Sequence, residues 1–366
     1  MKNMKIGIIG CGNISKAYFE GGQKASNLDV VACADLHLEA AQNQAERYGC
    51  KAMSVAELLT DPEIELVVNL TTPQAHLPVA TQCLNAGKHV YCEKPLGINF
   101  EEGKAVIALA AEKGLRVGCA PDTFLFGHAQ TSRKLVDEGW IGKPVAGMAV
   151  MMGHGHESWH PNPGFYYEQG GGPMLDMGPY YIHALINLLG PVKSVCGKTT
   201  KAFTERRATS EEAWGRILPV ETDTHLCGVL EFANGCLITM IMSFDSWQAE
   251  APPIQLFGTE GTLQVGDPNN YPHPPQVFRP GDDGFQTVST THPANARMIG
   301  VVDMVQAIRD GRPHRVNGDL ALHTLEVMLA FEASGKSGTH IEINTPCERP
   351  AALPMGLVEW EVDSSV

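Results

Sequence analysis

Runs of consecutive apolar residues alternate with amphipathic stretches through the first third of the chain. The apolar runs, which predict strands, cover residues 5–10, 28–35, 65–73, 89–95 and 116–121. The stretches between them, which predict helices, cover residues 14–24, 38–49, 74–88 and 99–114. A strand that is apolar at every position has both faces buried, and strict alternation of strand and helix is typical of a covered parallel sheet. The pattern predicts an α/β domain with a Rossmann-type parallel sheet over residues 1–122.

Longer strands replace this alternation after Pro121. Strands are expected at 144–153, 192–200, 224–233, 235–244 and 253–258, and helices at 123–138, 174–189, 296–310 and 319–334. Asn234-Gly235 between two of these strands is a typical hairpin turn. The elements predict an α+β domain over residues 123–345 with a large, mainly antiparallel open sheet. The proline-rich residues 271–284 are expected to form a surface loop, and residues 346–366 an extended acidic tail.

Composition limits the partners and the compartment. The 366-residue chain has a net charge of −14 at pH 7, which would repel nucleic acid and anionic membrane surfaces. No apolar run reaches the ~18 residues of a membrane span, and the first ten residues predict a strand rather than a signal peptide. The ten cysteines form no CxxC pair, and several lie in apolar runs, so we expect reduced thiols in a cytoplasmic protein.

The turn after the first strand has the features of a dinucleotide-binding loop, GCGNIS (10–15). Gly10 permits the tight turn, and Gly12 lets a pyrophosphate approach the backbone at the start of the next helix. Ser15 takes the place of the third glycine and is still small. Asp35 ends the second strand, where a carboxylate accepts hydrogen bonds from the adenosine ribose and repels a 2′-phosphate. We therefore expect NAD, with NADP as the alternative, held in this loop by Gly10, Gly12, Asn13 and Ile14.

Two further segments resemble those of a known family. EKP (93–95) ends a strand at the carboxyl edge of the predicted sheet, and GGGPMLDMGPYYIHAL (170–185) is a glycine-rich turn that enters a helix. Together with the dinucleotide-binding loop they resemble the Gfo/Idh/MocA oxidoreductases over essentially the whole chain. TTPQAH (71–76) resembles the family's segment beside the nicotinamide ribose. The resemblance implies additional cofactor contacts from Thr71, Thr72, Pro73, His76, Glu93 and Lys94.

Four residues are candidates for catalysis. Oxidation of a secondary alcohol needs a base within hydrogen-bond reach of the hydroxyl, besides an acceptor for the hydride. The Lys94 ammonium could bind the substrate oxygen and stabilise a developing alkoxide. Asp176, Tyr180 and His183 are four and three residues apart, so they share one face of the predicted helix. Three polar side chains on one face of an otherwise apolar helix would be costly in a core unless they line a site.

The identity of the base stays open. In family members with inositol-type substrates, the position four residues after the aspartate is usually histidine and resembles the general acid/base. This chain has Tyr180 there, as do relatives similar to glucose–fructose oxidoreductase, and a nearby lysine cation would favour the phenolate. His183 titrates closer to neutrality and competes with it, and Lys94 acting alone is the third candidate. Asp176 would orient the substrate or tune Lys94.

HGHESWH (154–160) is a histidine-rich loop ahead of the glycine-rich turn. Its histidines fit no helix face, no cysteine is near, and Glu157 is the only close carboxylate, so we expect no metal. A purely structural loop and a metal site are the alternatives to a substrate-binding loop. Aromatic rings can stack on the C–H faces of pyranose rings, so the segment favours a carbohydrate or cyclitol. The expected substrate contacts are His154, His156, Trp159, His160, Tyr166, Tyr180 and His183.

These residues favour an NAD(P)-dependent dehydrogenase acting on a secondary alcohol of a sugar, glycoside or cyclitol. A glycoside-cleaving enzyme that recycles its NAD would use the same residues, and net production of NADH distinguishes the two. A non-catalytic nucleotide-sensing protein is the third hypothesis, and the joint presence of Lys94, Asp176 and Tyr180 argues against it. Strands that are apolar on both faces would leave a monomer with an exposed apolar patch, so we expect a homodimer or homotetramer.

Overall fold

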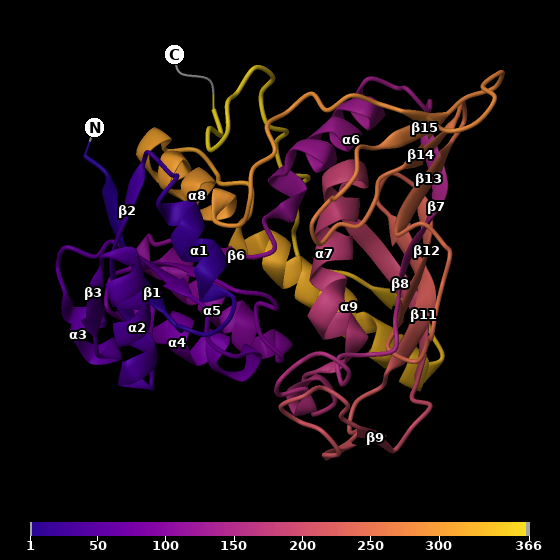
Figure 1. Ribbon diagram of the computed structural model, residues 1–366. Helices are drawn as coiled ribbons and strands as arrows, with labels where there is room; N and C mark the ends of the chain where they lie inside the picture. The colour runs from indigo at the N-terminus through magenta and orange to yellow at the C-terminus, as the bar shows by residue number, and fades with distance from the viewer. Residues whose placement is uncertain (1, 364–366) are drawn as a thin grey trace. The chain divides into compact units, whose positions relative to one another are not determined.

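The computed structural model describes residues 2–363 and divides into two compact units (Figure 1). Unit 1 combines the chain up to Gly127 with Thr291–Leu322 and the segment from Ala351. Unit 2 combines His128–Thr290 with His323–Pro350. The domain boundaries expected at residues 122 and 345 therefore need correction. Local sequence patterns place strands and helices, but they do not show which distant segments pack together.

Unit 1 is built on a six-stranded parallel sheet with the order β3-β2-β1-β4-β5-β6, the order of a dinucleotide-binding Rossmann fold. Its strands are β1 (Met4–Ile9), β2 (Leu28–Ala34), β3 (Lys51–Met53), β4 (Leu66–Asn69), β5 (His89–Cys92) and β6 (Val117–Cys119). Its main helices are α1 (Ser15–Gly22), α2 (Leu38–Tyr48), α3 (Val55–Thr60), α4 (Pro73–Asn85), α5 (Phe100–Lys113) and α8 (Ile299–Asp310). The predicted parallel sheet is confirmed, whereas β3 and α3 are too short to give a periodic signal.

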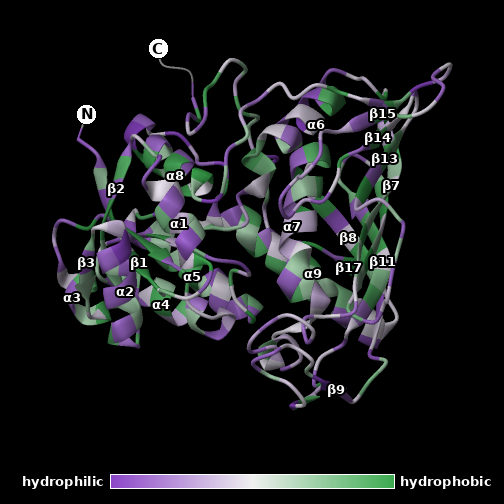
Figure 2. Ribbon diagram, in the orientation of Figure 1, coloured by the Kyte–Doolittle hydropathy of each residue, from purple (hydrophilic) through white to green (hydrophobic). Residues whose placement is uncertain are grey.

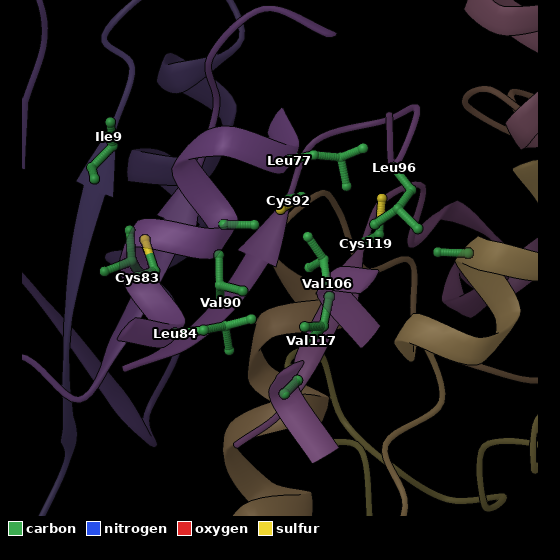
Figure 3. Close-up of a cluster of buried hydrophobic side chains, with 14 of the residues drawn as sticks. Ile9, Leu77, Cys83, Leu84, Val90, Cys92, Leu96, Val106, Val117 and Cys119 are labelled. Atoms are coloured by element: carbon green, nitrogen blue, oxygen red, sulfur yellow. The ribbon is translucent and has the colours of Figure 1, made fainter. Parts of the chain in front are cut away.

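The core of unit 1 holds the ends of the strands in place. Leu84 from α4, Val90 from β5 and Val106 from α5 are each at most 4% exposed and belong to one buried cluster (Figure 3). Hydrophobic residues gather on the strands of this sheet, while α2 carries polar stretches (Figure 2). α5 begins after Asn99, whose side chain accepts a hydrogen bond from the Glu102 amide. Such capping satisfies an amide that has no partner within the helix.

Distant segments complete unit 1. The buried Asp122 carboxylate accepts hydrogen bonds from the Met298 and Gly300 amides at the start of α8. Near the C-terminus, Asp363 pairs with Arg312 and Arg315. Leu353, Trp360 and Val362 are buried as well, at 3%, 8% and 3% exposure. The described part of the tail is extended, as expected, and interspersed apolar side chains and ion pairs hold it against the rest of unit 1.

Unit 2 contains a nine-stranded mixed sheet with the order β16-β15-β14-β13-β7-β12-β11-β8-β17. The larger strands are β7 (Pro144–Met152), β8 (Val192–Thr200), β11 (His225–Phe232), β12 (Leu237–Ser243) and β13 (Ile254–Gly258). The shorter ones are β14 (Thr262–Gln264), β15 (Gln276–Phe278), β16 (Gln286–Thr287) and β17 (Ile341–Glu342). The hairpin at Asn234-Gly235 is confirmed between β11 and β12. The stretch 271–284 is more than a loop, because it supplies β15.

Helices cover one face of this sheet. α7 (Gly172–Leu189) packs on β7, β11 and β12, and the Tyr181 hydroxyl donates to the Val150 carbonyl oxygen at 3.2 Å. Figure 1 shows α7 and the unit 2 part of α9 (Gly318–Ser337) on the same side of the sheet. α6 (Gly127–Asp137) lies beside α7. No helix within residues 2–363 is both long and apolar enough to cross a membrane.

The pairing of β7 with β12 determines which loops of unit 2 lie next to each other. β7 and β12 are neighbours and run parallel, with Met152 opposite Ser243. Parallel neighbours end at the same edge of a sheet, so the loops that follow residues 152 and 243 leave the sheet side by side. Two short antiparallel strands, β9 (Glu205–Arg207) and β10 (Ile217–Pro219), pair with each other, and β9 lies near this end of the nine-stranded sheet (Figure 1).

Candidate active site

The loop between β1 and α1 leaves space for a phosphate. Gly10 has φ of +103°, and a Cβ there would lie 2.6 Å from the backbone carbon and oxygen of Leu70. A Cβ on Gly12 would meet nothing within 4 Å. The first amides of a helix have no partner within it and attract an anion. The open space at Gly12, before α1, therefore fits a pyrophosphate.

Asp35 lies at the end of β2 next to this loop. Its two carboxylate oxygens accept hydrogen bonds from the Cys11 amide and the His37 amide, each at 2.8 Å. The carboxylate is thus fixed beside the phosphate loop, where it can still accept the hydroxyls of a ribose. The side chain of Ser15 is buried and donates to the Gly12 carbonyl oxygen at 2.7 Å. The small residue at this position closes the loop internally.

Hydrogen bonds of the buried Glu93 carboxylate fix the backbone of the EKP segment. Glu93 is 7% exposed, and its carboxylate accepts the Tyr18 hydroxyl of α1 at 2.8 Å and the Lys94 amide at 2.9 Å. The Lys94–Pro95 peptide is cis. Glu93 therefore fixes the backbone of Lys94, whose own side chain is half-buried. This gives Glu93 a positioning role within unit 1.

His76 ties the same segment to the start of α4. Its ring nitrogens lie 2.6 Å from the Pro95 carbonyl oxygen and 3.0 Å from the Thr71 carbonyl oxygen. The ring is 1% exposed, and burial lowers the pKa of His76. The two ring contacts of His76 thus join the EKP segment to the start of α4. Thr72 immediately precedes α4 and Pro73 is its first residue, and the Thr71 hydroxyl donates to the Asn69 side chain at 2.7 Å.

The three polar residues of α7 lie in different surroundings. Asp176 is near the start of the helix, where its carboxylate lies 3.1 Å from Nε2 of His156. Tyr180 and His183 follow along the helix and are 6% and 2% exposed. Gly171 admits the turn that precedes the helix, because a Cβ there would lie 2.6 Å from the Phe165 carbonyl oxygen. Asp176, one of the three polar residues expected to share a face of this helix, therefore contacts His156 of the histidine-rich loop.

Aromatic rings surround the Asp176–His156 pair. The centroid of the His156 ring lies 3.9 Å from that of Tyr166, 4.9 Å from that of Phe244 and 5.1 Å from that of Trp159. His160 meets Tyr166 edge to face at 5.3 Å. Four of the expected substrate contacts, His156, Trp159, His160 and Tyr166, thus form one cluster. The cluster therefore places apolar ring faces next to the histidine that contacts the Asp176 carboxylate.

His154 takes a different direction. Its ring stacks on Trp247 with the centroids 3.4 Å apart, away from the His156 cluster. Its carbonyl oxygen accepts a hydrogen bond from Arg206 Nη1 at 2.7 Å. His154 therefore has other aromatic neighbours than His156 and His160.

Glu157 is a structural residue. Arg206 pairs with it at 2.6 Å, and the Tyr167 hydroxyl donates to its other oxygen. Arg206 also pairs with Asp245 and donates to the Phe244 carbonyl oxygen at 2.7 Å. The pair fixes the two loops to each other. Among residues 2–363, no group of three or more His, Cys, Asp or Glu side chains could hold a metal ion.

Sequence reasoning missed Arg206, Phe244 and Trp247. Phe244 and Trp247 follow β12, and they reach the histidine-rich loop because β12 runs parallel to β7. The available signal was one aromatic residue at the end of a predicted strand and another three residues beyond it. Arg206 lies in the short strand β9, which has no periodic pattern.

Comparison with known proteins extends these observations. The model of the oxidoreductase family GFO_IDH_MocA, an NAD-binding Rossmann fold, matches residues 4–120, and the GFO/IDH/MocA C-terminal domain model matches residues 129–264. The trans-1,2-dihydrobenzene-1,2-diol dehydrogenase of Mus musculus is 30% identical over 266 residues, which are 72% of this chain and 74% of that protein. The 1,5-anhydro-D-fructose reductase of Ensifer adhaerens is 25% identical over 347 residues, or 93% and 98% of the two chains.

The solved structures agree on the fold. Levoglucosan dehydrogenase in complex with NADH and L-sorbose superposes with a TM-score of 0.81 at 22% identity, covering 94% of this chain and all of that one (100%). An NAD-binding oxidoreductase from Klebsiella pneumoniae gives a TM-score of 0.81 at 23% identity, with the same coverage of 94% and 100%. At these identities the likeness shows the fold alone.

Proposed function

The chain belongs to the Gfo/Idh/MocA family of NAD-binding oxidoreductases, and from this premise we propose that it oxidises a secondary alcohol of a sugar, glycoside or cyclitol reversibly. The observation that carries the proposal is the Asp176–His156 pair among aromatic rings at the start of α7. A fixed carboxylate beside ring faces suits a ligand that has both hydroxyl groups and apolar C–H faces. Sugar-related activities in the names of relatives support the same class.

The cofactor loop and the EKP segment have distinct tasks in this proposal. When bound, NAD supplies the acceptor for the hydride. Gly10, Gly12 and Asp35 hold its phosphate and ribose portions, and Glu93 keeps the backbone of Lys94 in place. The Lys94 ammonium binds the substrate oxygen and stabilises the negative charge that develops on it.

The residues of α7 orient the substrate and take its proton. His156 donates from Nε2 to Asp176 and so holds the carboxylate in one orientation. Asp176 then accepts a substrate hydroxyl, and the Tyr180 phenol, as phenolate, receives the proton of the hydroxyl that is oxidised. His183, one turn further along α7, is the competing base.

A screen of NAD⁺ reduction over aldoses, inositols and glycosides tests the proposal. A dehydrogenase accumulates NADH in proportion to the substrate oxidised. Cleavage of a glycoside without net NADH would instead support the enzyme with recycled NAD. Tight NAD binding without turnover of any compound in the screen would refute the proposal and favour a nucleotide sensor.

We also propose that the open face of the nine-stranded sheet joins copies of the chain. Strand register places Phe278, Thr262, Phe257, Ala146 and Leu237 in one row across five strands. Phe278, Phe257 and Leu237 are 36%, 37% and 49% exposed. Exposed apolar rows of this kind are rare on soluble monomers. Light scattering at micromolar concentration should give the mass of a dimer or tetramer, and a monomeric mass would refute this.

A further inference from the structure

Unit 2 contains a cavity of about 570 Å³ that the proposed reaction does not use. It lies between the histidine-rich loop, the β9 segment and the loop after β12. Its walls include His154, Phe203, Glu205, Arg206, Arg207 and Trp247. The volume lies within the range of ligand-binding pockets, roughly 300–1,000 Å³.

Two aromatic side chains line this cavity and remain exposed. Trp247 is 83% exposed although one face of its indole stacks on His154. Phe203 is 45% exposed, and its ring centroid lies 5.1 Å from the Arg206 guanidinium carbon. Large aromatic surfaces gathered at a concave site usually mark an interaction site. The cavity thus offers two ring faces to a ligand.

The cavity wall also contains buried polar atoms with no partner. Within residues 2–363, neither Nδ1 of His154 nor Nε of Arg206 has a hydrogen-bond partner, and Arg206 is 6% exposed. The terminal nitrogens of Arg206 are all engaged with protein oxygens, so Nε is the donor left over. Buried polar groups in native proteins nearly always have partners. Both atoms are covered by neighbouring side chains, and the neutral hydroxyl groups that line the cavity are those of Ser158 and Thr209.

The charges around the cavity favour a neutral ligand. Arg206 is paired with both Glu157 and Asp245. Arg207 is accompanied at the wall by Glu205. The two arginines are therefore matched by at least as many carboxylates, which leaves no positive excess for a phosphate or a carboxylate. Aromatic faces with neutral hydrogen-bonding capacity suit a sugar ring.

The cavity shares its loop with the proposed reaction site. His154 lines the cavity, and His156, two residues later, contacts Asp176. Arg206 and Glu157 fix the backbone between them. We infer that the cavity binds a second, neutral sugar ring, joined by a glycosidic bond to the ring that is oxidised, so that the preferred substrate is a disaccharide or larger glycoside. This inference rests on the proposed function.

Matched substrate pairs test the inference. The pairs are cellobiose with methyl β-D-glucopyranoside, maltose with methyl α-D-glucopyranoside, and lactose with methyl β-D-galactopyranoside. For the ring that the enzyme oxidises, we expect kcat/KM to be about 10-fold or more higher with the disaccharide, because remote binding energy contributes to catalysis. Equal values of kcat/KM within every pair would overturn the inference.

Variants of the cavity wall provide the second arm. Trp247→Ala and, separately, Phe203→Ala should reduce the preference for the disaccharide to near 1. Trp214→Ala is the matched control, because Trp214 is 76% exposed and does not line the cavity. It should keep the wild-type preference. A preference that survives in both Trp247→Ala and Phe203→Ala would overturn the inference, and having two variants guards against one that misfolds.

Equilibrium binding separates this inference from the proposed function. Calorimetric titration of the NAD-loaded protein with the same three disaccharides should show binding that Trp247→Ala weakens and Trp214→Ala does not. If that binding is seen but no compound in the screen reduces NAD⁺, the cavity stands and the proposed function fails. If UDP-glucose binds more tightly than any disaccharide and Arg207→Ala abolishes the difference, the ligand is anionic and the inference is wrong.

Discussion

The same substitution at two glycines of the cofactor loop should have opposite consequences. In Gly10→Ala, the new methyl group would lie 2.6 Å from backbone atoms of Leu70, which cannot move like a flexible side chain, at a φ of +103°. In Gly12→Ala, the methyl group would meet no protein atom within 4 Å. Gly10→Ala should therefore damage the fold, whereas Gly12→Ala should damage cofactor binding alone.

The magnitudes follow from these two environments. A side chain in the left-handed region costs roughly 1–2 kcal/mol, and overpacking adds roughly 1–3 kcal/mol, so Gly10→Ala should lower the free energy of unfolding by about 2–5 kcal/mol. Gly12→Ala should change it by at most about 0.5 kcal/mol. Its methyl group would instead separate the pyrophosphate from the backbone, and losing about 1.5–3 kcal/mol of charged hydrogen bonding raises the Kd for NADH roughly 10- to 150-fold.

Urea unfolding and a fluorescence titration with NADH measure the two quantities. Gly49→Ala is the control for backbone conformation, because Gly49 has φ of +74° and a Cβ there would meet nothing within 4 Å. Gly49→Ala should lower the free energy of unfolding only by the cost of a side chain in the left-handed region, about 1–2 kcal/mol. NADH affinity that is unchanged in Gly12→Ala would refute the placement of the pyrophosphate. Unchanged stability in Gly10→Ala would refute the packing of the loop on Leu70.

The other predictions concern cofactor choice, catalysis and pH. Asp35→Ala should narrow the preference for NAD over NADP in kcat/KM, and a wild-type enzyme that prefers NADP would contradict the reasoning. Lys94→Ala should reduce turnover roughly 10²- to 10⁴-fold with nearly unchanged Kd for NADH. Tyr180→Phe should reduce turnover similarly and remove the acid limb of the pH–rate profile, whereas normal turnover there with an inactive His183→Ala would make His183 the base. Burial raises the pKa of Asp122 to about 6, so the folded state binds the extra proton between pH 4 and 6. The free energy of unfolding should therefore fall as pH rises through this window, by up to about 3 kcal/mol. Urea unfolding at a series of pH values should show that this free energy depends less on pH in Asp122→Asn than in the wild type.

Local features of the sequence were sufficient for most of the Rossmann-type sheet. Continuous apolar strands, the GCGNIS turn and Asp35 each depend on neighbours along the chain, because strand burial and the tight turn are set by a few adjacent residues. The hairpin at Asn234-Gly235 is local in the same sense. The spacing of Asp176, Tyr180 and His183 on one helix face is also local, since helix geometry alone fixes it.

Tertiary structure decided everything that depends on non-local pairing. The parallel alignment of β7 and β12 brings Phe244 and Trp247 to the histidine-rich loop. The periodicity of apolar residues does not predict which strands become neighbours. His154 stacks on Trp247 and His156 packs against Tyr166, although the two histidines are only two residues apart on one loop. Membership of Thr291–Leu322 in unit 1 is equally non-local. A residue's spacing determines the face on which it lies, but the partner that this face meets is chosen by the packing of the whole chain.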